Sequence, residues 1–168
     1  MDDKITLERL LGLIHAGWKE FESTLERVGR ERMEQPGVSG ELSVKDVAAH
    51  VTWFEKDMLL LLSTRSMKEA SPLWGLPPDE RNRAIYEENR ARTVEDVLGE
   101  ARSVHAAMMA EIEKLSDDEL HAPSRFEGMP PDWTPWEILC ENTYEHYADH
   151  IHEIDRWLEK LRRGRNTP

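Results

Sequence analysis

The sequence predicts an all-α fold, a single four-helix bundle over residues 1–168, from three observations. Four long segments carry apolar residues at steps of three and four, which is the period of a helix with one buried face. No segment alternates apolar and polar residues in the way that predicts a half-buried strand. The chain has the length of one domain with its own core, and its 9 Gly and 9 Pro suit a helical protein. The helix directions stay open between up-down-down-up and up-down-up-down.

The first helix is expected from Thr6, a good N-cap residue, to about Val28. Its apolar stripe, which should face the core, consists of Leu7, Leu10, Leu11, Ile14, Trp18, Phe21 and Leu25. A run rich in turn residues, QPGVSG at 35–40, should connect this helix to the next one.

The second helix should begin after Ser43 and end near Ser63. Asp46 lies three residues after Ser43, which resembles a capping box with Asp in place of Glu or Gln. The inward stripe consists of Val44, Val47, Val51, Phe54, Met58 and Leu61. A long connector rich in proline follows. A short helix is expected in it from Pro78 to Arg90, because proline is tolerated in the first turn of a helix.

The third long helix should begin after Thr93, and Ser116 should cap one further turn that ends near Leu120. Its stripe consists of Val94, Val97, Leu98, Ala101, Val104, Met108, Ile112 and Leu115. A loop with three prolines, 121–132, precedes the fourth helix, which is expected to run unbroken from about Thr134 to Arg163. The stripe of the fourth helix consists of Trp136, Leu139, Thr143, Tyr147, Ile154, Trp157 and Leu161.

Two histidines of the fourth helix should point inward. His146 and His150 each lie three residues after a position of the inward stripe, and they are four residues apart. His152 is two residues from His150, roughly 200° around the helix, and should face water. Glu145 and Glu153 are also expected to face water.

His50 lies on the inward stripe of the second helix, three residues after Val47 and four before Phe54. A core position does not need a histidine, because Leu or Ile would bury more apolar area without a polar nitrogen to satisfy. Histidines at i and i+4 lie roughly 6 Å apart along the helix axis, which suits two imidazoles that bind one ion. A third histidine from another helix would give an open three-nitrogen site of the catalytic kind. The alternative is that these histidines are hydrogen-bonded helix residues without an ion.

The remaining histidines and two nearby carboxylates are expected outside this site. His15 lies on the flank of the first helix, His105 should face solvent or a helix boundary, and His121 lies in a loop. Asp46 and Asp149 neighbour the site histidines in sequence, but we assign both to the solvated helix surface.

Composition limits the partners. The net charge of −12 argues against nucleic acid and against an anionic membrane surface, which both need clustered Lys and Arg. The basic run at 160–165 stands near a helix C-terminus, where it interacts favourably with the helix dipole. No apolar run reaches the roughly 20 residues of a membrane helix. A lone cysteine excludes an internal disulfide and fits a cytoplasmic protein.

Aromatic residues suggest a pocket and an interface. Trp74 and Trp133 lie in the two long connectors, where they are candidates to cover the mouth of a site between helices. Trp18, Trp53 and Trp157 lie on helices that are already well supplied with apolar residues, which favours a homodimer. Cys140 is expected to be a buried, inert thiol.

The chain resembles the DinB-like superfamily of four-helix bundles over nearly its whole length, and within it the ClbS/DfsB branch. The segments that carry the resemblance are GELSVKDVAAH at 40–50 and NTYEHYADH at 142–150. Members typically hold a divalent metal with one histidine of the second helix and an HxxxH pair of the last. The resemblance therefore implies His50, His146 and His150 as the ligands, and homodimers are habitual in the family.

The resemblance implies two kinds of function. DinB-like proteins include transferases and isomerases that use a low-molecular-weight thiol as cosubstrate, which the metal would bind and activate. The ClbS branch includes a self-resistance protein that hydrolyses a cyclopropane-bearing genotoxin, and members of that branch do not always keep all three histidines. This sequence keeps them, which favours the metal-dependent interpretation. Imidazole ligands suit Zn, Ni, Fe and Cu alike, and we favour Zn or Ni, with Fe as a further candidate. A bundle that binds a small molecule without turnover is the remaining alternative.

Overall fold

The computed structural model describes residues 4–165, and helix is the dominant structure in this range. Four long helices form the bundle: α1 (Leu7–Val28), α2 (Val44–Thr64), α4 (Val94–Ile112) and α7 (Tyr144–Arg165). The shorter ones are α3 (Pro78–Asn89), α5 (Asp117–Leu120) and α6 (Pro135–Glu141). Within the described range the only β-type pairing consists of two isolated bridges. The all-α prediction is confirmed, and no described helix is both long enough and apolar enough to cross a bilayer.

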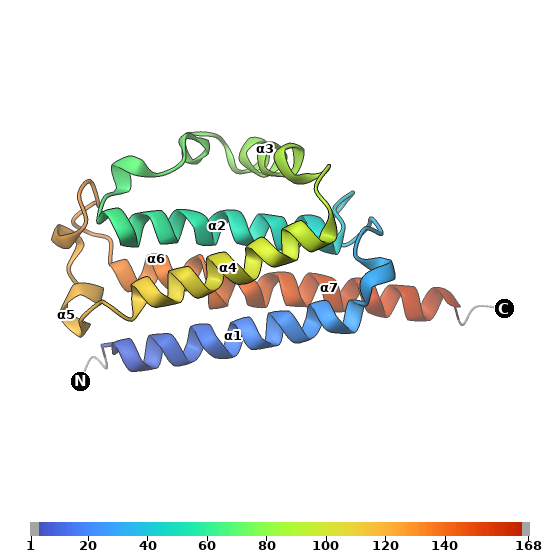
Figure 1. The fold of residues 1–168 in the computed structure, drawn as a ribbon, viewed down its shortest axis with the longest axis horizontal. Coiled ribbons are helices and arrows are strands. Elements are labelled where there is room, and N and C mark those ends of the chain that lie inside the picture. Colours follow the sequence, from blue (N-terminus) through green and yellow to red (C-terminus); the bar gives the residue numbers. More distant parts are fainter. Residues whose placement is uncertain (1–3, 166–168) are drawn as a thin grey trace.

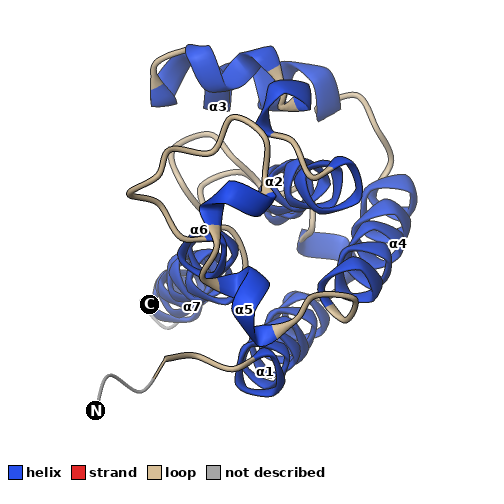
Figure 2. Cartoon of the chain, turned by 90° about the vertical axis from the view of Figure 1, so that its left-hand side faces the viewer, coloured by secondary structure: helices blue, strands red, loops and turns tan. Residues whose placement is uncertain are grey.

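The four long helices surround one core. The colours of Figure 1 show that α2 and α4 run in one direction and that α1 and α7 run in the opposite one. Seen end-on in Figure 2, α1, α4, α2 and α7 follow one another around the core, and α3 lies outside α2. The largest contacts are between α2 and α4 and between α1 and α7. The parallel course of α2 and α4 requires a long connection, which the segment with α3 supplies.

Most helix starts agree with the sequence prediction. The Thr6, Ser43, Thr93 and Ser116 side chains each accept a hydrogen bond from a backbone N–H in the first turn of their helices. The predicted capping box of α2 is complete, since the Asp46 carboxylate also accepts from the backbone N–H of Ser43. The short helix of the connector begins at Pro78 as expected.

The prediction of one unbroken fourth helix was wrong. The chain forms α6 up to Glu141 and begins α7 at Tyr144, with a break at Asn142 and Thr143. The Asn142 side-chain amide donates to the carbonyl of Ile138 at 2.7 Å. The Thr143 hydroxyl donates to the carbonyl four residues before it at 2.5 Å. Side chains that bond back to helix carbonyls in this way bend helices, which accounts for the break.

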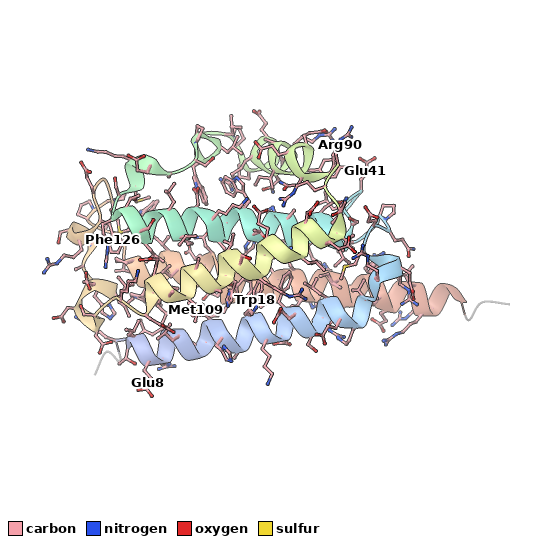
Figure 3. All side chains as sticks on the ribbon, in the orientation of Figure 1. Glu8, Trp18, Glu41, Arg90, Met109 and Phe126 are labelled. Atoms are coloured by element: carbon pink, nitrogen blue, oxygen red, sulfur yellow. The ribbon has the colours of Figure 1, made fainter. Side chains whose placement is uncertain are left out.

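Two of the three tryptophans that favoured a dimer interface belong to the core. Trp18 is 7% exposed and Trp157 is 4% exposed. In Figure 3, Trp18 lies on the inner side of α1, whereas Glu8 points outward from its first turn. Trp53 is half-buried and packs against Phe54 and Trp74 of the same chain. These tryptophans therefore pack within their own chain and do not indicate a dimer interface. The homodimer remains a prediction.

Candidate metal centre

Three histidines meet between α2 and α7. His50 comes from the second turn of α2, and His146 and His150 come from the first two turns of α7. Nε2 of His146 lies 3.1 Å from Nε2 of His50 and 3.0 Å from Nε2 of His150. One ring nitrogen of each histidine lies within 4.8 Å of those of the other two. The side chains predicted from helical spacing to point inward thus converge on one point.

Two of the distances between these nitrogens are close to those expected around a shared transition-metal ion. Imidazole nitrogens bind zinc at about 2.0–2.1 Å, so two such ligands in tetrahedral geometry lie roughly 3.4 Å apart. The observed separations of 3.1 and 3.0 Å are close to this value. A hydrogen-bonded set explains the geometry less well, because the single proton of a neutral His146 can serve only one of its two neighbours. The residues present therefore fit the metal that the sequence implies.

Burial keeps two of the histidines neutral. Burial, together with the nearby His150, lowers the pKa of His50 to about 3 and that of His146 to about 2. Since a metal binds the neutral imidazole, both side chains are in the form that binds an ion at neutral pH. Nδ1 of His146 is buried and has no hydrogen-bond partner among the described residues.

Glu153 belongs to the site, contrary to the prediction that it faces water. Its Oε2 lies 2.9 Å from Nδ1 of His150, and this hydrogen bond lowers the pKa of the Glu153 carboxyl. The two residues are three positions apart on α7, and the glutamate side chain is long enough to reach back along the helix. The contact holds the imidazole proton on Nδ1 and turns the lone pair of Nε2 toward the other histidines.

The other candidates around the cluster lie where the sequence predicts. His15, Glu145, Asp149 and His152 are exposed. His121 is half-buried in its loop, where its Nε2 lies 2.9 Å from the carbonyl oxygen of Ile5. Asp46 caps α2, although it also lines a hollow beside the cluster, so only its capping role is established by a contact.

Two hollows flank the histidines. The polar hollow, of about 160 Å³, reaches His50 and His150 and extends under α3. Its lining consists of Ser39, Leu42, Asp46, Val47, His50, Asn82, Ile85, Tyr86, His150 and Glu153. The apolar pocket, of about 370 Å³, lies toward α6. Its lining consists of Asp57, Met58, Leu61, Ser66, Met67, Ala70, Trp74, Trp133, Ile138, Glu141 and Asn142.

Phe54 stands between the histidines and the apolar pocket. Its ring centroid lies 4.8 Å from that of His50, 4.6 Å from that of His146 and 5.4 Å from that of Trp74. Trp74 and Trp133, the two tryptophans predicted to cover a site, both line the apolar pocket. Trp74 is tied to α2, because its indole N–H donates to the Asp57 carboxylate. Burial raises the pKa of that carboxyl.

A second buried polar cluster was missed from the sequence. His105 was expected to face solvent or a helix boundary, but it is 7% exposed, and its Nδ1 lies 2.8 Å from Oε1 of Glu55. The hydroxyl of Tyr147 donates to the same oxygen, and the ring of Trp18 stacks on His105 at 4.0 Å. Helical spacing could have predicted that His105 is buried, since it is four residues after Ala101 and three before Met108, which are both buried. This cluster lies in the core rather than at either hollow.

Cys140 is a buried thiol, as predicted. Burial raises its pKa, and the Tyr144 hydroxyl donates to its sulfur at 3.0 Å. A thiol with a raised pKa is a poor nucleophile at neutral pH, so this residue offers no second reactive centre.

Fold and site together define a four-helix-bundle protein with an inward-facing three-histidine cluster. Residues 13–154 match the family model of the DinB superfamily. The chain therefore belongs to the DinB superfamily, as the resemblance in the sequence predicted. A search of curated proteins found no match.

Solved structures share the fold at low sequence identity. An uncharacterised protein from Escherichia coli UTI89 is 19% identical, with a TM-score of 0.75 over 94% of this chain and 95% of that one. The colibactin self-resistance protein ClbS, solved in complex with double-stranded DNA, is 17% identical, with a TM-score of 0.74 over 90% and 94%. DfsB, a sibling lethal factor precursor, is 13% identical, with a TM-score of 0.75 over 94% and 97%. The two proteins that give the predicted branch its name thus have the fold of this chain.

Proposed function

We propose that the protein binds one divalent transition metal through His50, His146 and His150. The observation that carries the proposal is the convergence of three ring nitrogens from two helices, at separations that suit a common ion. The lowered pKa values of two of these imidazoles also support it. Zn or Ni is the favoured ion, and Fe stays open, because imidazole suits all three.

We propose further that the centre is catalytic. Three protein ligands leave a coordination position for water or a ligand, which is the arrangement of catalytic rather than structural zinc sites. When bound, such an ion lowers the pKa of a bound water or thiol and polarises a carbonyl group. The chain would then be a thiol-dependent transferase or isomerase, or a metal-dependent hydrolase.

The protein supplies the surroundings for a small-molecule substrate. Glu153 orients His150, and the polar hollow gives access to His50 and His150 from the side of α3. The apolar pocket, with Trp74 and Trp133 at its wall, suits an apolar part of the substrate. Phe54 lies between the two regions and contacts both His50 and Trp74, so it would pack against a molecule that reaches from one region to the other.

Specific observations favour two alternative functions. ClbS is a self-resistance protein against colibactin, and the shared fold favours a related role, in which this chain acts on an electrophilic small molecule. A bundle that binds a ligand without turnover would use the same pockets. Although ClbS was solved with DNA, we keep the prediction that this chain does not bind nucleic acid, because its net charge is −12.

The function is tested by elemental analysis of protein purified without a nickel column. We expect about one Zn or Ni per chain, since the three histidines form one site. After exchange for Co²⁺, the visible spectrum should change when a small thiol is added, because an open position accepts it. No bound metal would contradict the metal proposal, and a cobalt spectrum indifferent to thiols would favour a closed, non-catalytic site.

We also propose a homodimer in the cytoplasm, formed by one domain per chain. The single buried cysteine suits a reducing compartment, and dimers are habitual in the family. Sedimentation at micromolar concentration should show twice the chain mass of 19.6 kDa. A species of 19.6 kDa alone would contradict the dimer.

A further inference from the structure

Among the residues that the structure describes, Arg81 has no acidic partner, although it lies near the histidine cluster. It belongs to the first turn of α3, which packs over α2. Its side chain is half-buried and makes no hydrogen bond or ion pair with the described residues, and its Nε is buried without an acceptor. The chain has 34 Asp and Glu against 22 Lys and Arg, so acidic partners are abundant elsewhere. A buried guanidinium nitrogen without an acceptor is costly unless a ligand supplies one.

Aromatic rings hold this guanidinium in place. Its Cζ lies 4.6 Å from the ring centroid of Trp74 and 5.6 Å from that of Phe54. Phe54 in turn contacts both His50 and His146. Stacking uses the faces of a guanidinium and leaves its N–H edges free for hydrogen bonds to an anion. Arg81 thus stands one aromatic ring away from the histidine nitrogens.

We propose that Arg81 binds the carboxylate of a small molecule whose other end binds the metal held by the three histidines. The inference rests on the proposed function, because it requires the ion. A guanidinium is the side chain best suited to a carboxylate, since its fork of N–H groups makes two parallel hydrogen bonds. The ion and Arg81 would both attract an anion, because both carry positive charge.

The test compares three small thiols of similar length on the cobalt-loaded protein. Mercaptopropionate ends in a carboxylate, mercaptopropanol in a neutral hydroxyl, and cysteamine in an ammonium group. Binding is measured by titration of the cobalt absorption spectrum. The wild type should bind mercaptopropionate about tenfold or more tightly than mercaptopropanol, the effect of a charge-assisted hydrogen bond, and should bind cysteamine most weakly.

Variants assign that preference to Arg81. R81Q should bind mercaptopropionate and mercaptopropanol equally, and R81K, which keeps the charge but not the fork, should retain part of the preference. R83Q is the matched control, because Arg83 lies on the same helix, is exposed and pairs with Glu87. Metal affinity and the circular dichroism spectrum should be the same in all variants.

The outcomes separate this inference from the proposed function. A wild type without affinity for metal would contradict the proposed function. A wild type that binds the metal but does not prefer the carboxylate would overturn only the role of Arg81. That role would also be overturned if R83Q loses the preference as fully as R81Q, because the effect would then be one of general charge. If R81Q fails to fold, R81K tests the role of Arg81 in its place. An undiminished preference of R81K for mercaptopropionate would show that the fork of N–H groups is not used.

Discussion

Nδ1 of His150 lies 2.9 Å from Oε2 of Glu153, one turn further along α7. This contact defines which nitrogen of the histidine carries the proton, and therefore which nitrogen is free to bind an ion. The contact joins His150, which the sequence predicted to point inward, to Glu153, which the sequence predicted to face water.

Replacement of Glu153 should weaken metal binding without removing it. Because carboxylate partners of ligating histidines orient the ring and raise its basicity, we expect Glu153→Ala to reduce metal affinity about 10- to 100-fold. Glu145→Ala, on the exposed side of the same helix, is the control and should leave affinity unchanged. Isothermal titration with Zn²⁺ measures both. If both variants bind as the wild type does, Glu153 does not orient the ligand.

The cluster around Glu55 should contribute to stability rather than to metal binding. Tyr147→Phe removes a buried donor to the Glu55 carboxylate, so we expect a loss of about 1–3 kcal/mol in the free energy of unfolding. Tyr144→Phe is the comparison, since that hydroxyl donates only to the sulfur of Cys140, a weak acceptor, and the loss should be below about 1 kcal/mol. Urea unfolding measures the difference. Equal losses would mean that the Glu55 contact contributes nothing beyond packing.

The metal-free protein should lose stability as the pH falls below 6.5, the ordinary histidine pKa. The folded-state pKa values are about 3 for His50 and about 2 for His146, so the unfolded chain takes up protons that the folded chain does not. Stability is therefore full above pH 6.5 and falls by up to about 1.4 kcal/mol per pH unit and histidine as the pH approaches the folded-state values.

Urea unfolding of chelator-treated protein between pH 7 and 5 tests this. His50→Leu removes one of the two histidines that take up a proton on unfolding. The free energy of unfolding should therefore fall less steeply with pH, by up to about 1.4 kcal/mol per pH unit. His152→Leu, at an exposed position of α7, is the comparison variant. Identical slopes in all three proteins would show that His50 is not held neutral by burial.

Duplex DNA should not bind this chain at moderate salt. Phosphate contacts depend on clustered Lys and Arg, whereas the net charge here is −12. Fluorescence anisotropy of a labelled duplex should stay constant up to micromolar protein. A salt-dependent rise in anisotropy would contradict the prediction and would bring the chain closer to ClbS, which was solved with DNA.

The sequence predicted the bundle and the histidine cluster because both follow from helical periodicity. The apolar stripes place the inward faces, and the caps at Ser43 and Thr93 place the helix starts. Once the faces are known, His146 and His150 must lie on one side of α7, and His50 on the facing side of α2. The chain topology, by contrast, is not determined by periodicity, because each helix can bury its stripe in either direction.

What the sequence did not predict depends on contacts between distant segments or on side-chain reach. Glu153 lies at the edge of the inward stripe, where only the length of its side chain decides whether it reaches His150. Arg81 is adjacent to the site only because α3 folds back over α2. The break at Asn142 arises because a polar side chain competes for helix carbonyls, which no apolar pattern reveals. His105 was predicted to face solvent or a helix boundary, although its spacing from the buried Ala101 is that of a core residue.

The central claim is that His50, His146 and His150 bind one ion, and a metal titration of two matched variants tests it most directly. His150→Ala removes one of the three converging nitrogens, whereas His152→Ala removes an exposed imidazole two residues away. Isothermal titration of chelator-treated protein with Zn²⁺ should show one site per chain in the wild type and in His152→Ala, and the loss of most of the affinity in His150→Ala. Both variants should keep the circular dichroism spectrum of the wild type, because the core is apolar elsewhere. Unaltered zinc affinity in His150→Ala, or equal losses in the two variants, would contradict the three-histidine site.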